Sequence, residues 1–225
     1  DYYTDEFNAP TDLISYGAPR IAEDTSRLAE LDLAPKGFHL VVARFEVENH
    51  IDVIVKGYVR SGATLPLVVV GSAPYADEYT ARIESLADDR VRLLGGLWNQ
   101  RLLDALYAGA LVYYHGHSVG GTNPSLLRAI GAGAAVDAFD VSFNREVLDQ
   151  AGRYWTSPDD VAILVTSAES DVEAQVVRGE ESRKRAALYD WDEVASGYEA
   201  LARRLALEGP TRHRPSGRRT GKVSL

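Results

Sequence analysis

Short apolar runs alternate with amphipathic stretches along most of the chain. Five runs are continuous and rich in β-branched or aromatic residues, which is typical of strands buried on both faces. They occupy residues 38–43, 65–70, 91–94, 110–114 and 134–139. The stretches between them carry apolar residues at helical spacing, and they occupy residues 49–60, 75–87, 99–107 and 125–132. This alternation predicts an α/β fold, a doubly wound parallel sheet with helices on both faces.

The two ends of the chain extend this pattern less regularly. Residues 11–16 are predicted to form a short strand and residues 22–31 a short helix. After the fifth strand we expect a helical turn or two and a short edge strand, and then three closing helices. These elements are predicted at residues 144–150, 153–155, 158–167, 171–188 and 191–206. The Pro, Gly and Arg content from residue 208 onward predicts disorder.

The stretch between the fourth strand and the next helix is the strongest candidate for a binding site. Gly120 and Gly121 permit a sharp turn and close approach to a ligand. Thr122 or Asn123 can cap the helix, whose first turn suits Pro124. The free N–H groups of such a helix start bind anions, so the stretch suits a phosphate-bearing ligand. A tight turn without a ligand is the alternative.

Other candidate residues follow the remaining strands, because ligands of doubly wound sheets bind at the carboxyl ends of the strands. Arg44 can contact a phosphate in bidentate fashion, or it is a surface arginine paired with Glu46 or Glu48. Gly71 permits close approach, or it is a plain turn glycine. After the third strand, a flat base can lie against the backbone of residues 95–97 or against Trp98, unless Trp98 is simply packed.

Histidines and charged residues complete the candidate set. His115 and His117 flank Gly116, and either can bond a phosphate or a sugar hydroxyl. We expect no metal, because no carboxylate or cysteine set accompanies the two histidines. Beyond the fifth strand, Glu146 lies in a first helical turn, where the helix dipole stabilises a carboxylate in any case. The residues with side chains at that turn are Asp140, Asn144, Arg145 and Glu146.

Composition narrows the class of protein. The chain has 225 residues and a net charge of −9, which argues against nucleic acid as a partner. It has no cysteine, which excludes disulfides and thiolate zinc sites. The absence of a long apolar run or a signal-peptide pattern predicts a cytoplasmic protein. The chain starts at Asp1 and contains no methionine, so we expect it to be a fragment.

The last residues differ in charge from the rest. Residues 211–225 contain five basic and no acidic residues. A basic segment of this kind is either a solvated end or a contact with an anionic lipid surface at the inner face of a membrane. Peripheral membrane contact is therefore one expectation for this tail.

Six motifs in register carry a resemblance to a known family. They are residues 40–50 (LVVARFEVENH), 67–74 (LVVVGSAP), 91–95 (VRLLG), 120–127 (GGTNPSLL), 140–146 (DVSFNRE) and 189–198 (YDWDEVASGY). Between roughly residues 12 and 206 the chain resembles the C-terminal, donor-binding half of retaining family-4 glycosyltransferases with the GT-B fold. The rhamnosyltransferase-like branch of cell-wall and capsule synthesis is the most similar.

The resemblance implies a set of domains. Residues 1–20 are expected to be an interdomain linker with the last strand of a missing N-terminal domain. Residues 21–207 are expected to form the Rossmann-like domain that binds the nucleotide sugar, and residues 208–225 the tail. The last helix of the family usually crosses back to the N-terminal half.

The resemblance also implies roles for individual residues. Those assigned to the donor diphosphate are Arg44, Gly120, Gly121, Thr122 and Asn123. Those assigned to the base and ribose are Gly71, Gly95, Gly96, Leu97 and Arg128. His117 and Ser118 are assigned to the sugar. The catalytic residues are not identified, since the half that binds the acceptor is expected to lie outside this chain, and no cofactor is expected.

Three positions depart from what the family or the fold leads one to expect. The family usually has a glutamate near the glycine turn and another on the following helix, which commonly holds the ribose. Here these positions are Ser118 and Arg128, and an arginine cannot accept a hydrogen bond, so the usual ribose contact is absent. Arg128 either faces a phosphate instead or is a surface residue. Asp137 interrupts an apolar strand, where a buried unpaired carboxylate is costly.

We therefore expect a donor domain that binds a nucleotide-diphosphate sugar for retaining transfer to a glycan or lipid-linked acceptor. Without the N-terminal domain, the chain alone is expected to be inactive. The alternative is a non-catalytic nucleotide-binding or scaffolding module of the same fold. A sugar-nucleotide epimerase ranks lower, since no carboxylate pair is recognisable.

Overall fold

The computed structural model describes residues 6–7, 11–22, 24–73 and 77–209. Contacts divide the chain into two units. One unit is Tyr16–Trp191, and the other combines Asp1–Ser15 with Asp192–Leu225. The first unit contains the whole sheet.

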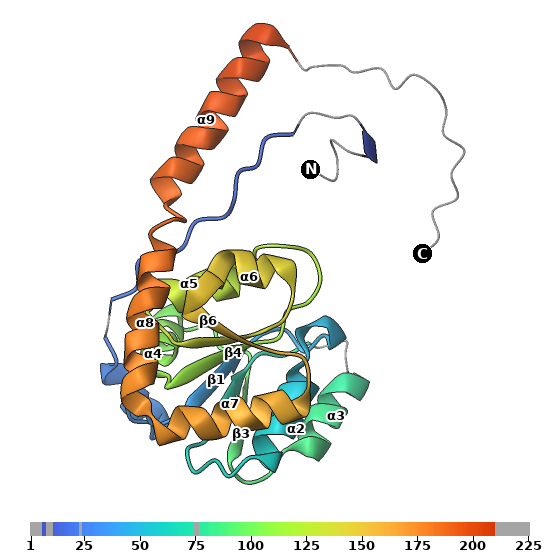
Figure 1. Ribbon diagram of the computed structural model, residues 1–225, viewed down its shortest axis with the longest axis vertical. Coiled ribbons are helices and arrows are strands. Elements are labelled where there is room, and N and C mark those ends of the chain that lie inside the picture. Colours follow the sequence, from blue (N-terminus) through green and yellow to red (C-terminus); the bar gives the residue numbers. More distant parts are fainter. Residues whose placement is uncertain (1–5, 8–10, 23, 74–76, 210–225) are drawn as a thin grey trace, which may run out of the picture. The chain divides into compact units, whose positions relative to one another are not determined.

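The sheet has six strands, and every neighbouring pair is parallel (Figure 1). The strands are β1 (His39–Val42), β2 (Leu67–Val70), β3 (Val91–Gly95), β4 (Val112–His115), β5 (Val136–Phe139) and β6 (Gly152–Trp155). Their order is β3-β2-β1-β4-β5-β6, so the direction of winding reverses between β1 and β4. The doubly wound parallel sheet predicted from the sequence is confirmed.

The two strands at this switch point diverge towards their carboxyl ends. β1 pairs with β2 along its full length, from His39 to Val42. It pairs with β4 only at His39 and Leu40, opposite Val112 and Tyr113. At a switch point, the connections that follow the two neighbouring strands run to opposite faces of the sheet, which opens a crevice between them. A doubly wound sheet binds its ligand in this crevice.

Helices cover both faces of the sheet, and each face has its own apolar core. One core is formed with α2 (Ile51–Arg60), α3 (Asp77–Leu86) and α7 (Pro158–Ser170). The other is formed with η1 (Ser26–Leu31), α4 (Gln100–Gly109), α5 (Pro124–Gly131) and α6 (Ser142–Leu148).

Strand side chains alternate between these two cores. Leu40 of β1 joins the α4–α5 side, and Val41 joins the α2–α7 side. Successive strand residues point to opposite faces, and here both faces are apolar. The continuous apolar runs in the sequence follow from this double burial. Three connecting elements complete this unit: η2 (Val47–Asn49), η3 (Asp149–Ala151) and α8 (Val172–Ala186), which packs on α5.

Two predictions near the start of the chain are wrong. Residues 11–16 form no strand, because a strand needs a neighbouring backbone and none pairs with them in the described part of the chain. The helix expected at residues 22–31 is a 3₁₀-helix that begins only at Ser26. Asp24 accepts bonds from the Ser26 N–H and hydroxyl, a side-chain turn that competes with a longer helix.

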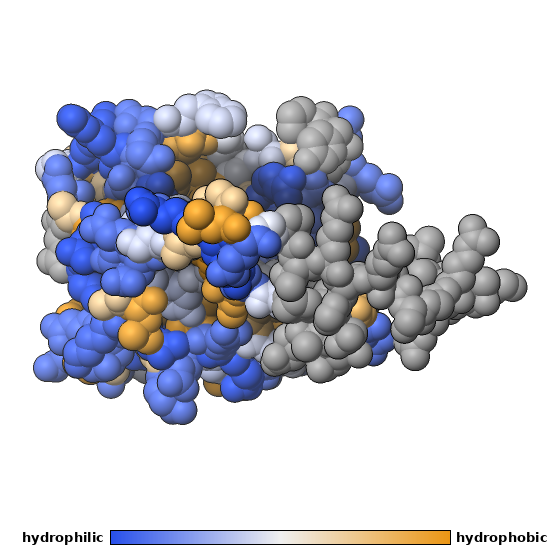
Figure 2. All heavy atoms as spheres, turned by 90° about the horizontal axis from the view of Figure 1, so that it is seen from above, coloured by the Kyte–Doolittle hydropathy of each residue, from blue (hydrophilic) through white to orange (hydrophobic). Residues whose placement is uncertain are grey.

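The second unit contains most of α9 (Trp191–Glu208). Within it, Ile14 lies beside Gly197, and Arg204 is paired with Asp12. The tail was predicted at residues 208–225; Glu208 ends α9, and residues 210–225 lie outside the described residues. None of the described helices is both long and apolar enough to span a bilayer. On the face drawn in Figure 2, hydrophilic side chains predominate, with smaller apolar groups between them.

Candidate functional site: a cleft at the switch point

Two adjoining hollows lie at the carboxyl ends of β1, β2 and β4. The outer hollow has a volume of about 280 Å³ and the inner one about 170 Å³. The two share Val42, Ala43, Arg44 and Ser125, so they form one cleft with a common wall. The outer hollow continues along Gly71, Ser72, Gly96, Leu97, Trp98 and Leu103. The inner one continues along Asn49, Tyr113, His115, Gly116, His117 and Asn123.

Arg44 stands where the two hollows meet. It follows β1 directly, and its side chain is exposed. Within the described residues its guanidinium makes neither an ion pair nor a side-chain hydrogen bond, so the expected alternative of pairing with Glu46 or Glu48 is not realised. The Arg44 carbonyl accepts a 2.9 Å bond from the buried Asn49 amide, which fixes the backbone. An arginine held in place without a counterion is suited to bind a phosphate.

Two glycines let the backbones around the cleft approach closely. A Cβ on Gly71 would lie 1.7 Å from the Ala43 carbonyl oxygen, and φ of Gly71 is +146°. A Cβ on Gly116 would lie 1.9 Å from the Asn49 carbonyl oxygen. No side chain fits at either position. Gly71 also lines the outer hollow, so it is both a structural glycine and part of the cleft wall.

The start of α5 has the geometry expected from the sequence. The Asn123 side chain caps the helix by accepting the Ser125 N–H at 2.8 Å, and Pro124 occupies the first turn. Gly120 has φ of +102°, which a residue with a side chain rarely adopts. Asn123 lines the inner hollow, whereas Gly120, Gly121 and Thr122 lie in the loop beside it and line neither hollow.

His117 and Ser118 are fixed by contacts with the η2 segment. His117 Nδ1 lies 3.0 Å from Asn49 Oδ1, and burial lowers the pKa of His117. Its neutral ring brings no positive charge to a phosphate, although it can bond a hydroxyl. The Ser118 hydroxyl donates to the Glu48 carbonyl at 3.1 Å, and the Ser118 N–H bonds the same oxygen. The structure therefore gives Ser118 a role in holding the loop.

A network of hydroxyl groups forms the floor between the hollows. The Ser125 hydroxyl lies 2.6 Å from the Tyr107 hydroxyl and 2.9 Å from that of Tyr113, and it donates to the Val42 carbonyl at 3.1 Å. Tyr113 in turn lies 3.1 Å from His115 Nδ1. Burial lowers the pKa of His115 to about 3, with a smaller contribution from His117, so the floor is neutral. Sequence analysis missed Ser125 and Asn49, because nothing local marks a first-turn serine or a pre-helix asparagine as part of a site.

The outer hollow is more apolar. Leu97 and Leu103 line it together with Val42 and Val70, and Trp98 stands at its edge. Gly95 is adjacent, with φ of +68°, and its carbonyl accepts a bond from the Gly71 N–H at 2.8 Å. Of the residues assigned to the base and ribose by resemblance, Gly71, Gly96 and Leu97 therefore line the outer hollow, and Gly95 lies next to them.

Arg128 lies outside the two hollows. It projects from α5 towards α4, and its guanidinium is 2.5 Å from the Asp104 carboxylate. The side chains of both residues are more than two-thirds buried. Arg128 was assigned to the ribose, but in the described structure it joins two helices.

Asp137 is buried, but its carboxylate is paired. The costly unpaired carboxylate suggested by the sequence is therefore not present. Arg153 of β6 holds both carboxylate oxygens, at 2.9 and 2.8 Å. Arg178 of α8 adds a bond of 2.8 Å. Both arginines are distant in sequence, so the sequence alone does not reveal the pairing. The carboxylate lies below the surface, and the network joins β5, β6 and α8.

The sheet order and the crevice at its switch point define a Rossmann-like domain, and the similar solved structures are GT-B glycosyltransferases. Sucrose-phosphate synthase from Thermosynechococcus elongatus matches with a TM-score of 0.80 at 23% identity, over 92% of this chain and 56% of that one. Anabaena HepE in complex with UDP-glucose matches with a TM-score of 0.69 at 15% identity, over 81% of this chain and 52% of that one.

One curated relative shares detectable sequence similarity. The GtfA subunit of the UDP-N-acetylglucosamine–peptide N-acetylglucosaminyltransferase of Streptococcus gordonii is 30% identical over 118 residues. The match covers 51% of this chain and 22% of that protein. No protein-family model matches the chain. The chain thus spans about half the length of the similar structures and about a fifth of the curated relative.

Proposed function

We propose that this chain is the donor-binding part of a glycosyltransferase, and that its cleft takes the nucleoside diphosphate of a nucleotide sugar. The observation that carries this proposal is the Arg44 guanidinium, which has no ion-pair partner among the described residues and stands where two hollows meet at the switch point of the sheet. Support comes from the similar structures, one of which contains UDP-glucose, and from the curated relative, whose name specifies a UDP sugar.

The two hollows suit the two ends of such a ligand. The outer, more apolar hollow suits a base and ribose, and the inner one, lined by neutral polar groups, suits a sugar. Arg44 between them is placed for the diphosphate. The free backbone N–H groups at the start of α5, beside Asn123, are a second group that can bind the anionic diphosphate.

In transfer, the diphosphate departs with negative charge as its bond to the sugar breaks. Arg44 and the start of α5 would stabilise that developing charge, which is the usual route by which a protein accelerates such a step. We further propose that transfer is retaining and that the acceptor is a glycan or a lipid-linked acceptor of cell-wall or polysaccharide synthesis. These finer points rest on the motif resemblance, with the rhamnosyltransferase-like branch as its specific form.

A calorimetric titration with UDP, dTDP and GDP in parallel tests the proposal. We expect saturable binding of one of them and a loss of affinity of roughly tenfold to a hundredfold in Arg44→Ala, because a hydrogen-bonded charge contributes on that scale. Arg60→Ala is the matched control, since Arg60 ends α2 and pairs with Asp159 away from the cleft. Equal affinity in the Arg44 variant, or no binding to any nucleotide, would overturn the proposal.

A non-catalytic module of the same fold is the second candidate. It is favoured by Ser118, which is engaged with Glu48, and by Arg128, which is engaged with Asp104. Arg128→Glu alone would set two carboxylates side by side. The exchange Arg128→Glu with Asp104→Arg keeps the ion pair and puts a carboxylate on α5. Stronger nucleotide binding by this double variant would indicate a donor site that has lost its ribose contact.

A further inference from the structure

His117 is held by a hydrogen bond that decides which nitrogen of its ring carries the proton. The Asn49 amide nitrogen donates to the Arg44 carbonyl at 2.9 Å, and the amide oxygen faces His117 Nδ1 at 3.0 Å. Because an amide oxygen can only accept, Nδ1 is the donor and carries the ring proton. In the neutral ring Nε2 is therefore without a proton, and it is the atom at which the ring can gain one.

This second nitrogen faces the glycine turn before α5. Among the described residues, the atom nearest to a Cβ built on Gly120 is His117 Nε2, at 3.8 Å. Glycine at this position places no side chain in front of the nitrogen. His117 and Arg44 line the same inner hollow. The protonatable atom therefore lies at the turn expected to meet a phosphate, beside the hollow that Arg44 also lines.

Burial keeps the ring of His117 neutral in the free protein. It is the largest influence on the pKa of His117, and it lowers that pKa below the ordinary value of 6.5. The positive charge of Arg44 lowers the pKa further, whereas the Glu48 carboxylate and a hydrogen-bonding contact with the Val119 backbone raise it. The net effect is a lowered pKa, so the free site holds the ring without its second proton.

The groups that pack against this ring from β4 and α6 carry no charge. The centroid of the His115 ring lies 6.2 Å away, and burial lowers the pKa of His115 to about 3. The centroid of the Phe143 ring lies at 6.1 Å, and the Asn144 amide donates to the His117 carbonyl at 3.0 Å. An anion in the hollow would therefore act on His117 without a competing charge from this side.

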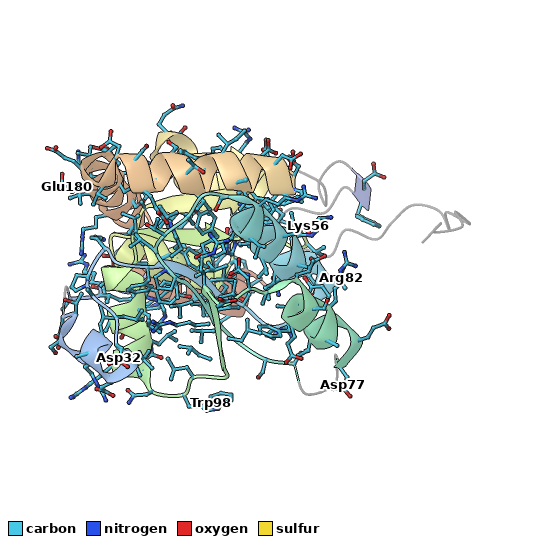
Figure 3. The ribbon with its side chains drawn as sticks, turned by 90° about the horizontal axis from the view of Figure 1, so that it is seen from below. Asp32, Lys56, Asp77, Arg82, Trp98 and Glu180 are labelled. Carbon is cyan, nitrogen blue, oxygen red and sulfur yellow. The ribbon has the colours of Figure 1, made fainter. Side chains whose placement is uncertain are left out.

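Arg44 is the only charged side chain among the described residues that line the cleft. Charged side chains on the helices, such as Lys56, Arg82 and Glu180, lie at the outside of the fold (Figure 3). The diphosphate of a nucleotide sugar carries two negative charges, so Arg44 alone leaves one of them uncompensated. Because a nearby opposite charge favours the charged form of a titratable group, a bound diphosphate would favour the protonated ring of His117.

We propose that His117 takes up a proton when a nucleotide sugar binds, and that it then serves as the second cation of the diphosphate site. The proposal rests on the nucleotide-binding function proposed above, and it makes binding depend on pH. It places His117 at the diphosphate, whereas the family resemblance places it at the sugar. The charged ring keeps its bond to Asn49, because Nδ1 donates in both protonation states.

Binding should therefore become tighter as the pH falls. The bound diphosphate stabilises the charged ring, so the pKa of His117 is higher in the complex than in the free protein. The gain in affinity is complete below the pKa of the free protein, and it is lost as the pH rises through the pKa of the complex.

Calorimetric titration with UDP-glucose at several pH values tests the proposal. UDP-glucose is the probe because both of its phosphates are esterified and lack the second ionisation, at about pH 6, of a terminal phosphate. We expect the affinity of the wild-type protein to rise roughly tenfold between about pH 8 and about pH 5. The binding heat near neutral pH should also depend on the ionisation enthalpy of the buffer, which reports the uptake of a proton.

Two histidine variants with the same replacement provide the comparison. His117→Asn keeps an amide N–H for the bond to Asn49 but cannot become charged, so it should bind like the wild type in mild alkali and gain little affinity in acid. His50→Asn is the matched control. His50 stacks on Phe139 outside the residues that line the hollows, and its φ of +45° is tolerated by asparagine. This control should keep the pH profile of the wild type.

The outcomes separate the two proposals. If the wild-type protein binds UDP-glucose without taking up a proton, or if the uptake persists in His117→Asn, then the role of His117 is overturned and the donor site stands. If the wild-type protein binds UDP-glucose at none of the pH values, the proposed function fails, and the role of His117 fails with it. Thermal unfolding shows whether His117→Asn is folded, and His117→Gln supplies a second neutral variant for the same measurement.

Discussion

At the scale of single residues, Asp137 shows how a costly group becomes tolerable. A carboxylate in the middle of a buried strand is unfavourable alone, since desolvation penalises its charged form. Arg153 and Arg178 supply two cations and three hydrogen bonds. The Trp155 indole donates to the carbonyl of the same residue. These groups therefore form a buried ion-pair network. Removing one member of it would leave a buried charge without its partner.

Asp137→Asn is predicted to destabilise the protein by about 3–5 kcal/mol, because two arginines would lose their counterion in a buried place. Urea unfolding measures the change. Asp140→Asn is the matched control, because Asp140 lies nearer the surface and pairs with the exposed Arg145, a contact worth about 1 kcal/mol or less. Equal losses of unfolding free energy in the two variants would show that the buried network contributes no more to stability than the surface ion pair does.

The structure places the residues predicted for the candidate site in different surroundings. Arg44 and Asn123 line the cleft as expected, because a residue just after a strand or just before a helix has a position fixed by the element it borders. Arg128 was placed at the ribose, yet it pairs with Asp104. The contacts of a side chain on a helix depend on which helix packs beside it, and the sequence does not show which helix that is.

At the scale of elements, the sequence predicted all six strands of the described sheet. Burial on both faces leaves apolar runs that mark the four central strands, β1, β2, β4 and β5. The failures are at residues 11–16 and at the start of η1. In the first, β-branched residues suggested a strand, but strand formation depends on a partner. In the second, the side chain of Asp24 decided where the helix begins. Neither determinant appears in apolar periodicity.

One contact between elements is predicted to respond to acid. Glu169 of α7 accepts bonds from Thr64 and Leu65, and it lies 3.1 Å from His39 Nε2 on β1. Burial alone would raise the pKa of Glu169. The hydrogen bonds from His39, Thr64 and Leu65 outweigh it and lower the pKa to about 2, from an ordinary value of 4.5. The carboxylate thus stabilises the folded state at pH values above the pKa that Glu169 has in the unfolded chain. This contribution is lost as the pH falls towards the lower pKa that Glu169 has in the folded protein.

Between about pH 5 and pH 2, the wild-type protein should therefore lose on the order of 2–3 kcal/mol more unfolding free energy than Glu169→Gln does. Urea unfolding across that range provides the comparison, and the difference between the two proteins removes the titration of other groups. Asp159→Asn, which alters an exposed pair on the same helix, should follow the wild-type curve. Parallel curves for Glu169→Gln and the wild type would rule out this contact as an acid-sensitive clamp.

At the scale of the whole molecule, the alternation of strands and helices predicted where the cleft would lie, because the carboxyl edge of a doubly wound sheet gathers the turns after its strands. It did not predict how the cleft is built. The hydroxyl network of Tyr107, Tyr113 and Ser125 needs the packing of α4 against β4 and α5, which depends on the side chains between them. Long-range packing of this kind leaves no local pattern in the sequence.

The cleft of this chain is predicted to bind a nucleotide sugar without transferring the sugar. Arg44 and Trp98 are exposed at the cleft, and a site open to water does not hold an acceptor hydroxyl against the bond to be broken. With UDP-glucose, calorimetry should report binding while the release of UDP stays far below about 1 per second, the lower end of ordinary enzyme turnover. The Arg44→Ala variant sets the background for both measurements. Release of UDP at ordinary enzymatic rates in the wild type, but not in Arg44→Ala, would show that the described cleft suffices for catalysis. That result would contradict the view that a donor site needs a second, acceptor-binding surface to become an active site.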